Sequence, residues 1–147
     1  MIRRGVDTNV LIYAHVPALP QHPAVRSFLE NQLDDPNVTL VLTAGILHEF
    51  VHVITDPRRF DPPVSMAEAL ALAREYLSRS NVAVAPTDEA ALRDSFALVD
   101  RHSLGRKRLA DALTVAALVN DDVNELISCN ERDFDGIGAL TVINPCG

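Results

Sequence analysis

The sequence predicts an α/β fold with a mostly parallel central sheet covered by helices on both faces. Short apolar runs alternate with longer segments of helical periodicity from one end of the chain to the other, and this alternation is typical of strand–helix–strand units. The chain has 147 residues, of which 48% are apolar, so it can bury a core of its own. No repeat, low-complexity tract or long linker divides it. We therefore expect residues 1–147 to form a single domain.

The first part of the chain predicts two strands with two helices between them. Residues 2–6 are a short opening strand, and residues 10–15 are a short helix that is stopped by the prolines that follow. Residues 22–33 carry apolar side chains at helical spacing. Residues 39–42 form a compact apolar run, which is typical of a buried parallel strand.

The middle of the chain predicts two more helices and a third strand. Thr43 is a suitable N-cap for a helix that runs to about residue 55. After a loop rich in proline and arginine, a capping box begins a helix over residues 65–80. Residues 82–84 then form a short strand.

The last part of the chain predicts two helices followed by two strands. The helices cover residues 87–102 and 109–120, and the second is the most apolar helix of the chain, with Asp111 as its one charged residue. The strands cover residues 126–128 and 140–143.

Composition limits the function classes. The net charge of −7 argues against a protein whose whole surface binds nucleic acid, although acids gathered around metal ions can dominate such a count. The two cysteines, Cys129 and Cys146, show no CxxC spacing, so neither a disulfide framework nor a thiolate zinc site is indicated and a reducing compartment is expected. No apolar run approaches the roughly 20 residues that span a bilayer. We expect a cytoplasmic protein without a membrane partner.

The triplet Asp7-Thr8-Asn9 places polar side chains inside an apolar run, directly after the opening strand. An unpaired, desolvated carboxylate costs several kcal/mol, so Asp7 is expected to cap a helix, to serve a site, or both. The carboxyl end of a strand is where open α/β sheets bind their ligands.

Several other acids occupy equivalent places in the predicted fold, past the ends of strands or in the helices that follow them. Because these places share one edge of a parallel sheet, the acids are expected to meet there, and they would repel one another unless protons or cations lay between them. Mg²⁺ or Mn²⁺ suits such oxygen ligands. The candidate metal-binding and catalytic residues are Asp7, Glu49, Asp111 and Asp133, with Asn9 and Ser128 nearby for hydrogen bonds or a bound water.

Structural interpretations stay open for most of these residues. Asp7 could be a helix cap only, and Glu49 could be a solvated helix residue. Asp133 and Asp135 lie in a charged loop where solvated acids are ordinary. Asp111 is the hardest to explain structurally, because apolar residues surround it in sequence.

Taken in order, these motifs resemble the PIN-domain nucleases, most closely the VapC-type toxins of bacterial toxin–antitoxin pairs. The resemblance covers essentially the whole chain. The segments that carry it are the Asp7-Thr8-Asn9-Val10-Leu11-Ile12 opening, the mid-helix Glu49, Ala110-Asp111-Ala112, Ser128-Cys129-Asn130-Glu131-Arg132-Asp133-Phe134 and Ile143-Asn144-Pro145.

The resemblance implies a PIN-like three-layer α/β/α ribonuclease domain. It implies an endoribonuclease that uses Mg²⁺ or Mn²⁺ and water to hydrolyse RNA phosphodiester bonds, forms a homodimer and is inhibited by a cognate antitoxin protein. Asp7, Glu49 and Asp111 match the family's acids. Many relatives have an Asp where this chain has Asn130, so Asp133, Asp135 or Asn130 itself could complete the site.

A competing motif is His48-Glu49-Phe50-Val51-His52, which spells the H-E-x-x-H signature of zinc proteases on a predicted helix. Glu68 or Glu75 could then supply a third ligand. A zinc metalloprotease is therefore an alternative, although it leaves Asp7 and Asp111 without a purpose. A third possibility is a catalytically weak metal-binding interaction module.

Basic residues lie just before Asp111, at Arg106, Lys107 and Arg108. They could hold RNA phosphates beside an acidic metal site. A solvated basic run is equally ordinary, so both interpretations stay open.

Overall fold

The computed structural model describes residues 1–147 and contains a five-stranded sheet in which all neighbouring strands are parallel. The strand order is β3-β2-β1-β4-β5. Because the strands are parallel, the segments that leave their carboxyl ends emerge at one edge of the sheet. The strands are β1 (Ile2–Val6), β2 (Val38–Thr43), β3 (Val82–Ala85), β4 (Glu125–Ile127) and β5 (Thr141–Ile143).

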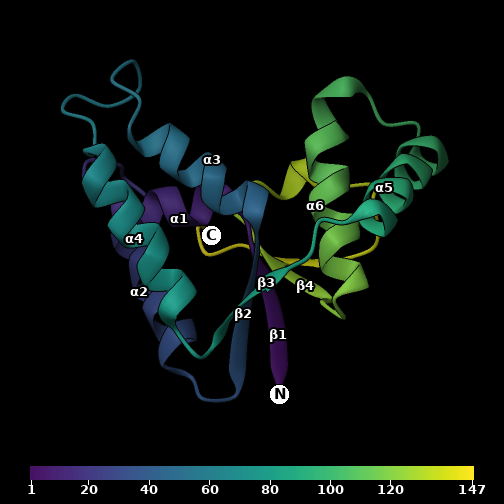
Figure 1. The fold of residues 1–147 in the computed structure, drawn as a ribbon, viewed down its shortest axis with the longest axis horizontal. Coiled ribbons are helices and arrows are strands. Elements are labelled where there is room, and N and C mark those ends of the chain that lie inside the picture. The colour runs from purple at the N-terminus through teal and green to yellow at the C-terminus, as the bar shows by residue number, and fades with distance from the viewer.

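Helices cover both faces of the sheet and make three layers (Figure 1). Helices α1 to α4 lie on one face, and α5 and α6 lie on the other. The expected three-layer α/β/α fold with a parallel sheet is confirmed. The helices are α1 (Thr8–His15), α2 (His22–Asp34), α3 (Ala44–Ile54), α4 (Met66–Ser78), α5 (Glu89–His102) and α6 (Leu109–Asn120), and the short 3-10 turns are η1 (Arg106–Arg108) and η2 (Glu131–Asp133).

The sheet separates two apolar clusters. The larger, of 18 buried residues, lies under α1 to α4 and includes the fully buried Phe50. The smaller, of 8 buried residues, lies under α6 and includes Val41 of β2, Leu126 of β4, and Phe134 and Ile137 of the segment that follows β4. Both faces of β2 are therefore buried, which explains why this strand reads as a nearly continuous apolar run.

Gly5 in β1 allows α6 to pack closely on the middle of the sheet. A Cβ atom at this position would lie 2.7 Å from Cδ1 of Leu118 in α6 and 3.1 Å from Cδ1 of Leu126 in β4. The missing side chain thus helps to fix α6, and with it Asp111, relative to β1.

The elements agree with the predicted ones to within a few residues, and the differences have local causes. The first helix begins at Thr8, because Asp7 caps it. The helix predicted over residues 65–80 ends at Ser78, where the backbone becomes extended at Arg79. Strand β4 ends at Ile127, which leaves Ser128 at the edge of the sheet.

The two cysteines, Cys129 and Cys146, form a disulfide, which corrects the expectation that their spacing indicates none. Their Cα atoms lie 5.4 Å apart although 17 positions separate them in sequence. Cys129 follows β4 and Cys146 follows β5, and these strands are parallel neighbours. Both cysteines therefore leave the sheet at the same edge, a relation that their sequence spacing does not reveal.

None of the helices combines the length and the apolar character that crossing a bilayer requires.

Replacing Phe50 by alanine is expected to lower the free energy of unfolding by about 3–5 kcal/mol, because it leaves a cavity in the larger cluster. Phe96 is 53% exposed on α5, so Phe96→Ala is a matched control that should change stability by less than about 0.5 kcal/mol. Urea unfolding followed by circular dichroism measures both. Similar losses from the two variants would contradict the described core.

Candidate functional site

Asp7 caps α1 and also faces the carboxyl edge of the sheet. Its Oδ1 accepts a hydrogen bond from the Thr8 backbone N–H at 2.8 Å. Its Oδ2 accepts from Ser128 Oγ at 2.8 Å and from Asn9 Nδ2 at 3.2 Å. The capping and site interpretations of Asp7 are therefore compatible, because each carboxylate oxygen serves a different set of partners.

Asn9 and Ser128 link the start of α1 to the segment after β4. Asn9 Nδ2 donates to Ser128 Oγ at 3.4 Å, and Asn9 Oδ1 accepts from the Cys129 backbone N–H at 3.1 Å. The Asn130 backbone N–H donates to Ser128 Oγ at 3.0 Å. Residues about 120 positions apart are thus joined by hydrogen bonds around Asp7.

Glu49 reaches the same edge from α3, which directly follows β2. Thr43 caps this helix, because its side-chain oxygen accepts from the Ile46 backbone N–H at 3.2 Å. The Thr8 hydroxyl donates to Glu49 Oε2 at 3.5 Å. Glu49 is exposed whereas the neighbouring Phe50 is fully buried, so the helix turns its acid toward solvent at the site.

Asp111 and Asp133 come from the other side of the sheet. Asp111 lies in the first turn of α6, half-buried, and Asp133 lies in η2 after β4. The Asn130 side-chain amide donates to Asp133 Oδ2. Asn130 and Asp133 are therefore both near the site, with the amide holding the carboxylate.

The four acids line one cleft of about 540 Å³. A smaller adjoining cavity of about 210 Å³ is lined by three of them and by the hydroxyl residues Thr8, Thr43, Thr87 and Thr114. The acids in the larger cleft are Asp7, Glu49, Asp111 and Asp133.

Burial and mutual repulsion raise the pKa of two of these acids. Burial is the larger cause for Asp7, and Glu49 and Asp133 add to it, whereas hydrogen bonds from Ser128 and Thr8 act in the opposite direction. Burial, together with the smaller effect of the negative charges of Asp133, Asp7 and Glu49, raises the pKa of Asp111 to about 6. The acids are close enough to influence one another's charge.

The donor chemistry of the cleft fits a hydrated divalent cation. No three acidic, histidine or cysteine side chains converge closely enough to hold a metal ion directly. The lining instead offers carboxylate, hydroxyl and amide oxygens around open space. Mg²⁺ uses such ligands and commonly keeps several waters while bound through one or two carboxylates. Asp7 and Asp111 are the acids of the cleft whose pKa is raised by burial, and they would be the primary ligands.

Comparison with known proteins identifies the family of the chain. The model of the PIN domain family matches residues 6–140. The chain belongs to the PIN domain family. Among curated proteins, this PIN domain is 25% identical to ribonuclease VapC33 of Mycobacterium tuberculosis over 95% of each chain. It is 39% identical to VapC ribonuclease Mb2897 of Mycobacterium bovis over 64 residues, which are 44% of this chain and 43% of the relative.

Solved structures of VapC proteins share the fold. VapBC-1 from nontypeable Haemophilus influenzae superposes with a TM-score of 0.68 at 15% identity, covering 99% of this PIN domain and 100% of that chain. VapC20 of Mycobacterium tuberculosis, described as a toxin that cleaves the sarcin-ricin loop, gives a TM-score of 0.64 at 15% identity over 84% and 86% of the two chains. The expected resemblance to VapC-type PIN domains is confirmed.

The H-E-x-x-H interpretation is wrong. His48 and His52 are exposed on α3 and line an apolar groove together with residues of α4, such as Met66 and Leu70. Glu49 lines the acidic cleft instead. Because no third acidic, histidine or cysteine side chain joins the two histidines, they form no zinc site.

The basic residues before α6 divide into two kinds. Arg106 and Lys107 are exposed and remain available to phosphates. Arg108 is half-buried, and its guanidinium donates to the backbone oxygens of Arg132 and Asp135. Its expected role in RNA binding is therefore not supported by its contacts.

Thr8 and Arg59 line the acidic cleft but were not named as candidate site residues. Thr8 is only 5% exposed and contacts Glu49, and its place between Asp7 and Asn9 was the available signal. Arg59 lines the cleft from the loop after α3. Its position depends on the path of that loop, which no sequence pattern indicates.

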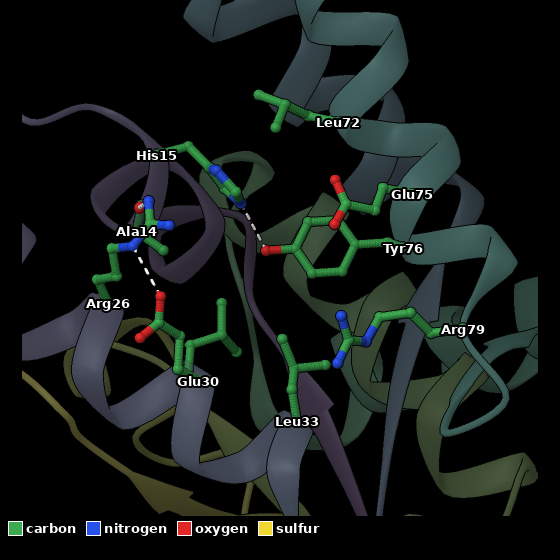
Figure 2. Close-up of a pocket in the computed structure, with 10 residues that line it drawn as sticks. Ala14, His15, Arg26, Glu30, Leu33, Leu72, Glu75, Tyr76 and Arg79 are labelled. Atoms are coloured by element: carbon green, nitrogen blue, oxygen red, sulfur yellow. Dashed lines mark hydrogen bonds and ion pairs between the residues drawn. The ribbon is translucent and has the colours of Figure 1, made fainter.

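A separate cavity of about 140 Å³ lies between α1, α2 and α4 (Figure 2). His15 Nε2 is 2.6 Å from the Tyr76 hydroxyl, and Arg26 pairs with Glu30. Burial lowers the pKa of His15 to about 4, with a smaller contribution from Arg26. His15 is therefore neutral at pH 7, and its hydrogen bond joins α1 to α4. None of the four acids lines this cavity.

The raised pKa of Asp111 predicts a pH effect on stability in the presence of a chelator. Between the ordinary carboxyl value of 3.8 and about 6, folded Asp111 binds more protons than the unfolded chain does, so its contribution to stability is lost as the pH rises through this window. Asp111→Asn should remove this loss. The stability of the variant relative to wild type should increase from pH 4 to pH 6.5.

Urea unfolding at several pH values in EDTA measures this difference. Asp100→Asn, an exposed position on α5, makes the same change of charge outside the cleft and should show no such trend. A difference between Asp111→Asn and wild type that stays constant with pH would rule out the predicted titration of Asp111.

Proposed function

We propose that this PIN domain is an endoribonuclease that depends on Mg²⁺ or Mn²⁺ and acts as the toxin of a toxin–antitoxin pair. The observation that carries the proposal is the shared cleft of Asp7, Glu49, Asp111 and Asp133, which come from separate parts of the chain. The ribonuclease activity named for VapC33, which aligns with nearly the whole chain, supports the choice of RNA as substrate.

In this proposal, Asp7 and Asp111 would hold the cation from opposite sides of the sheet edge. Glu49 and Asp133 would add further negative charge to the lining of the cleft. A bound divalent ion would acidify a water molecule and neutralise charge on the phosphoryl group. Asp7 Oδ2 is kept in place by Ser128 and Asn9, so its carboxylate has little freedom to turn away.

Substrate binding must overcome the negative charge of the cleft. Arg59 lines the cleft, and Arg106 and Lys107 are exposed just before α6. These side chains would hold RNA phosphates beside the acids, and their contribution should weaken as salt is added.

An antitoxin partner is proposed from the structural neighbours. Several of them are VapBC assemblies, including one from Salmonella typhimurium and one from Rickettsia felis described as bound to DNA. From the resemblance to VapC-type toxins we also propose a homodimer and a cytoplasmic location.

Purified protein is expected to cleave RNA with Mg²⁺ or Mn²⁺ and to stop when EDTA is added. Asp7→Asn and Asp111→Asn should each lower the cleavage rate by at least about 100-fold while the fold is kept, because each removes a negative ligand. Hydrolysis of a fluorescent RNA measures the rate, and circular dichroism checks the fold. Asp100→Asn is the matched control and should cleave as wild type does.

Two other results of this experiment would contradict the proposed function. Full cleavage by both cleft variants would show that the carboxylates are not the catalytic groups. Tight Mn²⁺ binding without RNA cleavage would instead favour a metal-binding interaction module.

A further inference from the structure

We propose that Arg108 is a positioning residue that holds Asp133 at the acidic cleft by joining its loop to the start of α6. This inference rests on the proposed function, because it assigns Arg108 a role in the cation site rather than in RNA binding.

Arg108 donates hydrogen bonds to residues on both sides of Asp133 in the sequence. Its Nη2 donates to the backbone oxygen of Arg132 at 2.6 Å, and its Nη1 donates to the backbone oxygen of Asp135 at 2.8 Å. Arg108 itself immediately precedes α6, three residues before Asp111. A single guanidinium therefore connects the segments that carry two of the four acids.

No other hydrogen bond ties residues 131–139 to a distant part of the chain. The backbone hydrogen bonds of Asp133, Phe134 and Ile137 run to residues three positions earlier, and the bond from Asn130 to Asp133 is equally local. Phe134 and Ile137 pack into the smaller apolar cluster and anchor the loop from below. The polar restraint toward α6 comes from Arg108 alone.

This restraint acts against electrostatic repulsion. The negative charge of Asp133 is felt at Asp111, together with those of Asp7 and Glu49. Repulsion between these carboxylates favours movement of the exposed loop away from α6. Arg108 opposes that movement with two hydrogen bonds and with a positive charge placed between the two segments.

The bond geometry depends on the forked shape of the arginine side chain. Its planar guanidinium presents several N–H donors in a fixed arrangement, so two of its nitrogens can reach separate carbonyl oxygens at once. A lysine keeps the charge but offers a single ammonium group. Arg108→Lys therefore separates positioning from simple charge.

The test compares Arg108→Ala and Arg108→Lys with wild type in full-length protein. Mn²⁺ affinity is measured by titration, and amide hydrogen exchange is followed in residues 131–138. We expect both variants to bind Mn²⁺ about 10–100-fold more weakly and to exchange faster in this loop, with β1 unchanged. Arg93→Ala, an exposed arginine on α5, is the control and should match wild type in both measurements.

A double-mutant cycle shows whether Arg108 acts through Asp133. If it does, Arg108→Ala should change Mn²⁺ affinity by less than about twofold when Asp133 is already replaced by asparagine. RNA cleavage by Arg108→Ala should need more Mn²⁺ than wild type while its salt dependence stays the same. An unchanged Mn²⁺ affinity with a salt slope reduced by about one would overturn the proposal and make Arg108 a phosphate-binding residue.

The two proposals fail in different ways. If wild type does not cleave RNA, the proposed function is wrong, and the exchange rates still decide whether Arg108 holds the loop. If wild type cleaves RNA but Arg108→Ala keeps wild-type exchange and Mn²⁺ affinity, the positioning role alone is wrong.

Discussion

The structure depends on one constraint, which is that carboxylates gathered at one sheet edge repel each other. Parallel strands deliver their following segments to a common edge, and in this chain those segments carry Asp7, Glu49, Asp111 and Asp133. Burial and, to a lesser extent, mutual repulsion raise the pKa of Asp7 and Asp111, so the site favours a form in which protons or cations offset the negative charge. Because the fold keeps these carboxylates together despite their repulsion and partial burial, the acids are expected to have a function.

Other polar contacts at this edge of the sheet lower the energetic cost of gathering the carboxylates there. Ser128, Asn9 and the backbone of Thr8 satisfy the oxygens of Asp7. Asn130 donates to the Asp133 side chain, and Arg108 donates to backbone oxygens of the same loop. Below them, the apolar clusters and the close approach at Gly5 keep the helices that carry the acids at fixed positions.

Much of the fold could be predicted because its signals are local. Apolar runs, caps and prolines placed every strand and helix to within a few residues, and the alternation of strands and helices indicated the parallel sheet. The convergence of Asp7, Glu49 and Asp111 followed from that topology, since strand ends and helix starts share an edge. The disulfide of Cys129 with Cys146 did not follow, because it depends on which strands are neighbours and on how the last residues turn.

The sequence by itself determined the order of the elements and the kinds of side chain at their ends, because backbone preferences and apolar periodicity act over a few residues. Only the tertiary structure decided which of these side chains share a partner. It separated Glu49 from His48 and His52, and it turned Arg108 toward two carbonyl oxygens rather than toward solvent. Such pairings join residues tens of positions apart, so they depend on loop paths and helix packing that no local pattern contains.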